Sequence, residues 1–342
     1  MAKKTLISFG LLFAIFSTYP QISYGESMSL DMEIACTRSL DLTGNQLPFF
    51  PTHLLNQIDL EELWIDDNQI LDIPFEIDRL VNLKRLSAYK NRLTNLPESI
   101  FRLENLERLN LSVNKLSSLS DNIGRLAKLQ ILDINHNQLS ELPGSIGSLS
   151  NLRFLYVAGN RLNSLPFSLK NLKNLVYLNI THNQFKNIPE CVGDMKNLIE
   201  LRIYNNAIGS IPDYIVNLQR LKEIHAMNNQ IGSLSNSIGN LTSLRKLMLE
   251  NNNLQTLPES ISDLENLTDL DLRGNQLTSL PESIGNLKSL RFLDLRDNKL
   301  KSLPKSLLNL THLEKLDVRL NKHLEIPEWV HEFEERGCTV FY

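Results

Sequence analysis

The sequence predicts a curved, right-handed α/β solenoid of 13 repeats, with one parallel β-sheet on the concave face and short helical segments on the convex face. Three observations predict this class. Asparagine recurs thirteen times at a constant spacing of 23 residues, seven apolar columns accompany it, and eleven of the thirteen prolines lie six residues after it. A fixed period of this length is typical of proteins built from stacked repeats.

The composition is that of an ordinary globular protein and excludes several other classes. The 342 residues are 42% hydrophobic and 22% charged, with a formal net charge of -4. This charge gives no positive field for a polyanion, so we expect no nucleic-acid partner. Three cysteines are too few for a disulfide-stapled scaffold, and we expect Cys36, Cys191 and Cys338 to be free and mostly buried.

Residues 1–25 are predicted to be a secretory signal peptide. Lys3 and Lys4 precede an apolar run over residues 6–16, and the small residues Ser23 and Gly25 favour cleavage after Gly25. The alternative is an uncleaved anchor, but the run is shorter than the ~20 residues that cross a bilayer. We therefore expect an exported chain with no membrane span after signal removal, beginning with an N-terminal cap over residues 26–39.

The recurring asparagines predict a polar ladder inside the coil, where each strand ends. A side-chain amide both donates and accepts hydrogen bonds, so it satisfies backbone groups that the strands leave unpaired. The ladder consists of Asn45, Asn68, Asn91, Asn114, Asn137, Asn160, Asn183, Asn206, Asn229, Asn252, Asn275, Asn298 and Asn321.

The apolar columns predict which side chains are buried. Over thirteen repeats they comprise 91 positions, and the three polar exceptions, Thr37, Gln57 and His323, lie in the first or last repeat. Terminal coils of a solenoid face water on one side, which accounts for these exceptions. Alternation within each repeat, as in residues 270–272, indicates a strand with leucines inward, and stacking spaces neighbouring strands by ~4.8 Å.

The proline column is predicted to lie in the first turn of a short helix, as at Pro281. The array then covers residues 40–326. Residues 327–342 are predicted to form a C-terminal cap, with a short helix, a stop at Gly337 and a final strand over the last coil.

The consensus reads L-x-x-L-x-L-x-x-N-x-L-x-x-L-P-x-x-I-x-x-L. It resembles the leucine-rich repeat family, in its 23-residue, Ras-scaffold-like form found in plants, animals and many bacteria. The resemblance implies a horseshoe with the sheet on its inner curve, and arrays of this family bind proteins. Cysteine-bounded caps of animal extracellular members are absent, which favours the secreted bacterial type. By analogy, such arrays act as adhesins or host-directed effectors.

We find no pattern that predicts catalysis. The seven histidines lack metal-ligand spacing, and phosphate-binding loops and nucleophile motifs are absent from the sequence. Secreted bacterial leucine-rich-repeat ubiquitin ligases carry a catalytic module after the array, whereas only a cap follows here. The sequence predicts no cofactor, no metal and no enzyme activity.

The outward-facing strand positions distinguish this array from others, because the inward positions are occupied by packing. Large aromatic, methionine and arginine side chains in these positions are the candidates for partner binding. They are Trp64, Tyr89, Phe154, Tyr156, Tyr177, Arg202, Tyr204, His225, Met227, Met248, Arg273, Arg296 and Arg319.

Three zones follow along this face. We expect an acidic patch of Glu61, Glu62, Asp66 and Asp67 around Trp64, then a central aromatic and methionine surface. The C-terminal zone sets an aspartate column beside an arginine column. These columns either neutralise each other or orient a charged partner.

The sequence thus predicts a non-enzymatic, monomeric protein-binding module, exported from a bacterial cell and recognising a macromolecule through its concave sheet. It is expected in the medium, the periplasm or at the cell surface. Two alternatives stay open. Central tyrosines could stack on sugars in a carbohydrate-binding surface protein, or the chain could act inside the cell as a signalling scaffold.

Overall fold

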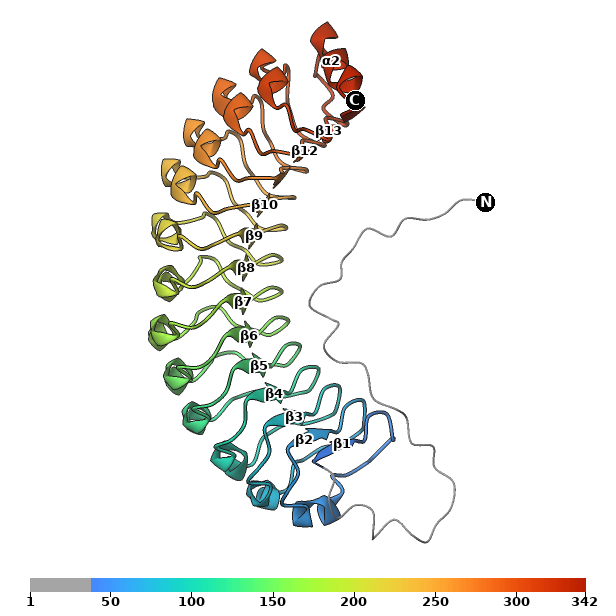
Figure 1. Ribbon diagram of the computed structural model, residues 1–342, viewed down its shortest axis with the longest axis vertical. Coiled ribbons are helices and arrows are strands. Elements are labelled where there is room, and N and C mark those ends of the chain that lie inside the picture. Colours follow the sequence, from blue (N-terminus) through green and yellow to red (C-terminus); the bar gives the residue numbers. More distant parts are fainter. Residues whose placement is uncertain (1–37) are drawn as a thin grey trace, which may run out of the picture. The chain divides into compact units, whose positions relative to one another are not determined.

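The computed structural model describes residues 38–342, which form one curved array. The predicted signal peptide and all but the last two residues of the predicted N-terminal cap lie outside the described residues. In the array the strands line the inner curve and the short helices line the outer curve (Figure 1). The solenoid predicted from the sequence is confirmed.

Fourteen three-residue strands form a single parallel sheet in sequence order within the described residues. Each central residue pairs with the central residue of the next strand, as Leu247 does with Leu270. The strands are β1 (Ser39–Asp41), β2 (Glu62–Trp64), β3 (Arg85–Ser87), β4 (Arg108–Asn110), β5 (Ile131–Asp133), β6 (Phe154–Tyr156), β7 (Tyr177–Asn179), β8 (Glu200–Arg202), β9 (Glu223–His225), β10 (Lys246–Met248), β11 (Asp269–Asp271), β12 (Phe292–Asp294), β13 (Lys315–Asp317) and β14 (Thr339–Phe341).

The convex side is built from 3₁₀-helices, which are short because their hydrogen-bond geometry is poor. They are η2 (Thr52–Asn56), η3 (Phe75–Arg79), η4 (Glu98–Arg102), η5 (Asp121–Arg125), η6 (Gly144–Ser148), η7 (Phe167–Asn171), η8 (Glu190–Asp194), η9 (Asp213–Asn217), η10 (Asn236–Asn240), η11 (Glu259–Asp263), η12 (Glu282–Asn286), η13 (Lys305–Asn309) and η14 (Glu328–Val330). At the C-terminal end, α2 (His331–Glu335) follows η14, Gly337 turns the chain with φ 84°, and β14 pairs with β13.

The proline column lies one residue earlier than predicted. Pro281 has φ -66° and ψ 147°, which is extended backbone, and η12 begins at the next residue. Proline therefore fixes the entry to each helix and does not lie in its first turn. Ser120 and Ser235 replace proline in two repeats, and their hydroxyl groups accept hydrogen bonds from the backbone N–H of Asn122 and Ser237.

The core is continuous from η2 to the C-terminal cap, and each repeat contributes the same leucine and isoleucine positions. Leu270 and Leu272 are fully buried, as their inward position predicts. Cys191 and Cys338 are free and buried, and burial raises the pKa of each thiol to about 11. Cys36 lies outside the described residues. In the described part of the chain, no helix is long and apolar enough to cross a membrane.

The asparagine ladder joins each coil to the preceding one. The Oδ1 atom of Asn137 accepts from the backbone N–H of Leu116 at 2.9 Å, and its Nδ2 atom donates to the carbonyl of Leu111 at 3.0 Å. The same Nδ2 group also faces two carbonyls of its own coil, Ile134 and Asn135. All twelve asparagines from Asn68 to Asn321 bond the preceding coil in this way.

The residue before each ladder asparagine has a positive φ in all thirteen repeats, a feature that the sequence analysis missed. This left-handed conformation turns the chain out of the strand. It is easy for glycine and tolerated by asparagine and aspartate, which occupy eight of the thirteen positions (Gly44, Asp67, Gly159, Asn205, Asn228, Asn251, Gly274 and Asp297). Val113 has φ 56° and is β-branched, so its coil holds local backbone strain.

Candidate binding surface on the concave face

Three outward columns form the concave surface, at positions six, four and two residues before each ladder asparagine. Neighbouring strands bring the members of one column side by side, as the pairing of Phe154 with Tyr177 and of Arg202 with His225 shows. The structure places all the candidate residues named above on this surface, on ten of the twelve coils from β2 to β13.

The centre of this surface is an aromatic cluster on β6 and β7. The rings of Tyr156 and Tyr177 have centroids 4.8 Å apart at 39°, and those of Phe154 and Tyr177 lie 6.3 Å apart at 37°. Tilted, offset rings at these separations attract each other beyond their area burial. Phe154, Tyr156, Tyr204, Met227 and Met248 are each partly exposed, so the cluster continues as an apolar surface toward β10.

The expectation that Tyr177 is exposed is wrong. Tyr177 is only 6% exposed, because the Tyr156 ring covers it and the Arg202 guanidinium lies 5.6 Å from its ring centroid. Burial raises the pKa of the Tyr177 hydroxyl well above its usual value. Tyr177 therefore lies at the buried base of the cluster, and Phe154 and Tyr156 are its solvent-accessible members.

A polar network on β8 and β9 borders the cluster. The Nε atom of Arg202 donates to Glu200 at 2.5 Å, and His225 Nε2 lies 2.9 Å from Glu223 and 3.8 Å from Glu200. The hydrogen bond to His225 is the main reason that the pKa of Glu223 falls to about 2, with Lys246 also contributing. The sequence analysis missed this convergence because it searched for spacing within a segment, whereas the residues lie one repeat apart.

Glu200, Glu223 and His225 each bring one ligand atom within 4.8 Å of the others, so this trio is the place in the described residues where a metal ion would fit best. The carboxylates already have cationic partners, because Arg202 pairs with Glu200 and Lys246 lies 3.2 Å from Glu223. The arrangement is thus accounted for as a neutral ion-pair network, and it gives no reason to invoke a metal.

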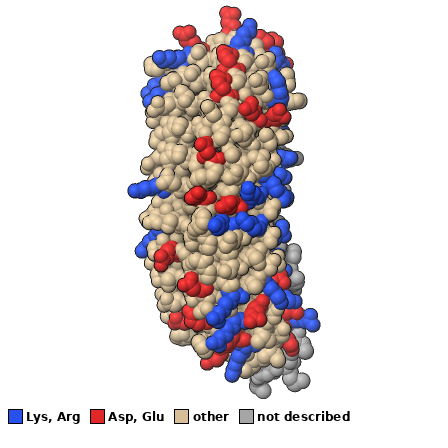
Figure 2. All heavy atoms as spheres, turned by 90° about the vertical axis from the view of Figure 1, so that its left-hand side faces the viewer, with Lys and Arg blue, Asp and Glu red and all other residues tan. Residues whose placement is uncertain are grey.

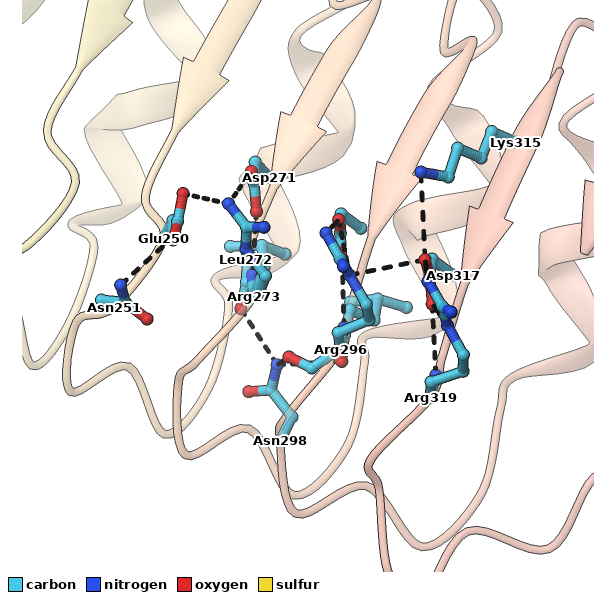
Figure 3. A network of polar contacts seen from close by, with 12 residues as sticks. Glu250, Asn251, Asp271, Leu272, Arg273, Arg296, Asn298, Lys315, Asp317 and Arg319 are labelled. Carbon is cyan, nitrogen blue, oxygen red and sulfur yellow. Dashed lines mark hydrogen bonds and ion pairs between the residues drawn. The ribbon is translucent and has the colours of Figure 1, made fainter. Parts of the chain in front are cut away.

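The C-terminal columns neutralise each other, which was one of the two interpretations of the sequence (Figure 3). The Nε and Nη2 atoms of Arg296 donate hydrogen bonds to the Asp294 carboxylate at 2.9 and 2.6 Å. The same Nε atom also lies 3.4 Å from Asp317. Asp317 is fully buried beneath Arg319, which donates to it at 2.9 and 2.7 Å. The pKa of Arg296 rises accordingly, chiefly through its hydrogen bonds to Asp294.

Arg273 follows the same pattern, since it pairs with Glu250 of the preceding coil and lies 3.6 Å from Asp271. All three candidate arginines of this zone therefore have acidic partners within the chain. Because these arginines are already paired, we assign them to the edge of the candidate binding surface and not to its centre.

The predicted acidic patch near the N-terminal end is wrong, because the next coil supplies the opposite charge. Glu62 pairs with Arg85 at 2.6 Å, and Asp67 pairs with Lys90 at 2.8 Å. Asp66 is instead held by neutral donors, the Ser87 hydroxyl group and the Tyr89 backbone N–H. Trp64 and Tyr89 therefore lie beside acids whose charges are mostly balanced by the next coil, with Asp66 as the exception, and Tyr89 is 39% exposed.

Asp133 differs from the other acids at the centre of the concave face. Its Oδ1 atom accepts from the backbone N–H of Asn135 at 3.0 Å, and no basic group of the described residues lies within ion-pair distance. Burial raises the pKa of this carboxyl group to about 6. Asp133 pairs in register with Tyr156, so the carboxylate borders the aromatic cluster.

We expect Asp133→Asn to stabilise the isolated protein at pH 7.5. Burial raises the pKa of Asp133 in the folded state to about 6 from its ordinary value of 3.8, so protonation of this carboxyl group favours folding. The stability that protonation of Asp133 contributes is fully present below pH 3.8 and is lost as the pH rises through 6. Asparagine is always neutral and keeps an oxygen for the Asn135 N–H, so we expect a gain of about 1–2 kcal/mol at pH 7.5.

Chemical denaturation at pH 7.5 and pH 4.5 measures this gain, which should shrink at the lower pH. The matched control is Asp294→Asn in the same column, which breaks the ion pair with Arg296 and should destabilise the protein at pH 7.5. Equal gains for Asp133→Asn at both pH values would contradict the assigned cause.

Figure 2 shows the convex face. Charged side chains are scattered over it with broad uncharged stretches between them. Its large exposed apolar groups include Phe75 and Phe167, each 58% exposed, which lie on η3 and η7, four repeats apart.

A second asparagine column lies on the flank of the coils, nine residues before the ladder, and the sequence analysis missed it. The Nδ2 atom of Asn151, for example, donates to the carbonyl of Ala127 in the preceding coil at 2.8 Å. The other members that do so are Asn82, Asn105, Asn174, Asn197 and Asn266. Recurrence at the 23-residue period was the available signal.

The comparisons with known proteins agree with this architecture. A family model described as a leucine-rich repeat region matches residues 107–176, 167–271 and 230–335. A leucine-rich repeat protein of Leptospira interrogans is 31% identical, with a TM-score of 0.82, and the match covers 88% of this chain and 83% of that one. No relative was found among curated proteins.

Two further solved structures are more distant. An internalin of Listeria monocytogenes is 26% identical with a TM-score of 0.68, over 78% of this chain and 76% of that one. The ectodomain of an Arabidopsis thaliana membrane receptor kinase, in complex with Casparian strip integrity factor 2, is 29% identical with a TM-score of 0.65. That match covers 82% of this chain and only 38% of the ectodomain.

The repeated coil, the ladder and these matches define a leucine-rich repeat solenoid. The chain belongs to the leucine-rich repeat family. Proteins of this family are in general interaction modules that bind other proteins.

Proposed function

We propose that this chain is a non-enzymatic module that captures a protein partner on the centre of its concave face. One observation carries the proposal. Phe154, Tyr156, Tyr204, Met227 and Met248 remain partly exposed on four of the five coils from β6 to β10, whereas flanking charged residues such as Glu62, Asp294 and Asp317 are neutralised within the chain. Partly exposed aromatic and methionine side chains in a concave array are typical of the centre of a protein interface.

The remaining candidates have graded roles in this proposal. Arg202 and His225 border the centre, and Trp64 and Tyr89 extend the surface toward the N-terminal end. Arg273, Arg296 and Arg319 form a peripheral charged zone that orients the partner. Tyr177 supports the contact residues from below and does not touch the partner.

We further propose that the chain works as a monomer exported from a bacterial cell. The basic and apolar pattern of residues 1–25 supports export. The similarity to bacterial leucine-rich repeat proteins supports the source. The Arabidopsis ectodomain was solved in complex with Casparian strip integrity factor 2, which supports a binding role for an array of this kind.

Substitution at the centre of the concave face tests the binding function. We expect Phe154→Ser with Tyr204→Ser to abolish partner capture in a pull-down from surface and extracellular fractions, because the pair removes two aromatic anchors. Hot-spot residues of this kind each contribute about 2 kcal/mol or more to binding. The thermal unfolding midpoint should stay close to that of the unmodified protein, since both side chains are partly exposed.

The matched control is Phe75→Ser with Phe167→Ser, which removes two exposed rings from the convex face. This variant should capture the same partner as the unmodified protein. Retained capture by the concave variant, or equal loss in both variants, would overturn the assignment of the concave face. Capture of glycans in place of protein would overturn the assigned partner class.

A further inference from the structure

We infer that Asp133 and Tyr156 form a site for one basic side chain, lysine or arginine, of the protein partner. This inference rests on the proposed function and names the chemistry that the concave face recognises. Asp133 is the last residue of β5, and Tyr156 is its register partner on β6. A carboxylate beside an aromatic ring is the combination that holds a cation by charge and by the ring quadrupole.

The same face already contains this arrangement with the cation supplied by the chain itself. Arg202 lies 5.6 Å from the Tyr177 ring centroid and donates to Glu200 at 2.5 Å. Each component comes from β7 or β8, so the trio is built across neighbouring strands.

A second instance lies at the C-terminal end. The Arg319 guanidinium is 4.7 Å from the Phe341 ring centroid, and its Nη2 atom lies 2.7 Å from Asp317. Lys315 makes the same pair of contacts, at 5.4 Å to the Phe341 ring and 3.9 Å to Asp317. An aromatic ring and a carboxylate therefore share a cation of the chain at two places on this face.

Asp133 and Tyr156 make up the third arrangement, and the described residues provide no cation for it. In the same column, Asp271, Asp294 and Asp317 each have an arginine within ion-pair distance, and Asp133 has none. The neighbours of Asp133 in its column are Asn110 and Tyr156, which are uncharged. Burial also raises the pKa of Asp133 without any compensating charge.

An incoming cation would meet a half-buried carboxylate that has lost part of its hydration. Coulombic attraction is stronger in such an environment than at a fully exposed surface. The same partial burial makes the unpaired carboxylate unfavourable in the free protein, so binding would relieve a cost that the free state carries. Ile131 and Phe154 pair in register at the other end of the same two strands and are partly exposed, so they extend the site as an apolar surface.

Titration with small probes in solution NMR tests the site without an identified partner. The probes are N-acetyl-arginine methylamide and its neutral isostere N-acetyl-citrulline methylamide. We expect the arginine probe to shift the backbone signal of Asn135 and the ring signals of Tyr156, with an affinity about 10-fold above that of the citrulline probe. Asp133→Asn should abolish the difference between the probes.

Asp294→Asn is the matched control, because Arg296 neutralises Asp294 and the Asp133 site is intact in that variant. Its probe response at Tyr156 should equal that of the unmodified protein. Equal responses to the two probes, absence of any local response, or an unchanged preference in Asp133→Asn would each overturn the cation site.

The failure of this inference is distinguishable from the failure of the proposed function. If the probes fail to discriminate while Phe154→Ser with Tyr204→Ser still abolishes capture, the cation site is wrong and the binding surface stands. If the arginine probe binds at Asp133 while capture survives that double substitution, the cation site stands and the proposed surface is wrong.

Discussion

Asn137→Ala is expected to destabilise the protein by about 3 kcal/mol, because the substitution leaves buried backbone groups without partners. In the folded state Asn137 is 8% exposed and satisfies the N–H of Leu116 and the carbonyl of Leu111, both in the preceding coil. Asn137→Asp keeps the acceptor but turns a negative oxygen toward three carbonyls, so it should destabilise at least as much. The free energy of unfolding, from chemical denaturation, measures both effects.

Asn151→Ala is the control for this prediction. Asn151 is exposed and makes one inter-coil hydrogen bond, to the carbonyl of Ala127 at 2.8 Å, and water replaces that bond when it is lost. We expect a loss below about 1 kcal/mol. Comparable losses for Asn137→Ala and Asn151→Ala would show that the ladder is not the main polar connection between coils.

Gly285→Ala is expected to destabilise the protein by about 3 kcal/mol, although alanine normally favours helical conformations. A Cβ atom at Gly285 would lie 2.1 Å from the carbonyl oxygen of Ser306 and 2.7 Å from its carbonyl carbon. These are backbone atoms of the next coil, so η12 and η13 would have to separate. The packing between two convex helices would be lost as a result.

Gly144→Ala is the matched control, because Gly144 also lies in a 3₁₀-helix and a Cβ atom there meets nothing within 4 Å. It should leave the unfolding free energy unchanged or raise it slightly. Thermal unfolding of the two variants separates close coil packing from helix propensity. A loss at Gly144 equal to that at Gly285 would contradict the packing argument.

Much of the fold was predictable because the same pattern of residue types recurs in thirteen repeats, so each repeat supports the assignment made for the others. The apolar columns fixed the inward face, and the spacing of the asparagines fixed the register of the coils. Both follow from local alternation and period, which a sequence displays directly. The proline column was recognised, but its position was wrong by one residue, since the sequence does not show where the extended backbone ends and the helix begins.

The candidate site was less predictable, because its properties depend on side chains one repeat apart. The predicted exposure failed at Tyr177, which Tyr156 and Arg202 cover. The acidic patch around Trp64 failed for the same kind of reason, since Arg85 and Lys90 of the next coil neutralise it. Both errors come from reading charge and exposure along the chain instead of across the sheet.

The sequence by itself determined the period, the inward columns, the ladder and the family, because each depends on residue types at fixed intervals. Only the tertiary structure decided which outward side chains are paired, covered or left without a counter-charge. Those outcomes depend on distances of a few ångströms between neighbouring strands. Stacking places Arg296 within 3.4 Å of Asp317 on the next strand and covers Tyr177 with Tyr156 and Arg202, and these contacts between coils cannot be read from residue types at fixed intervals.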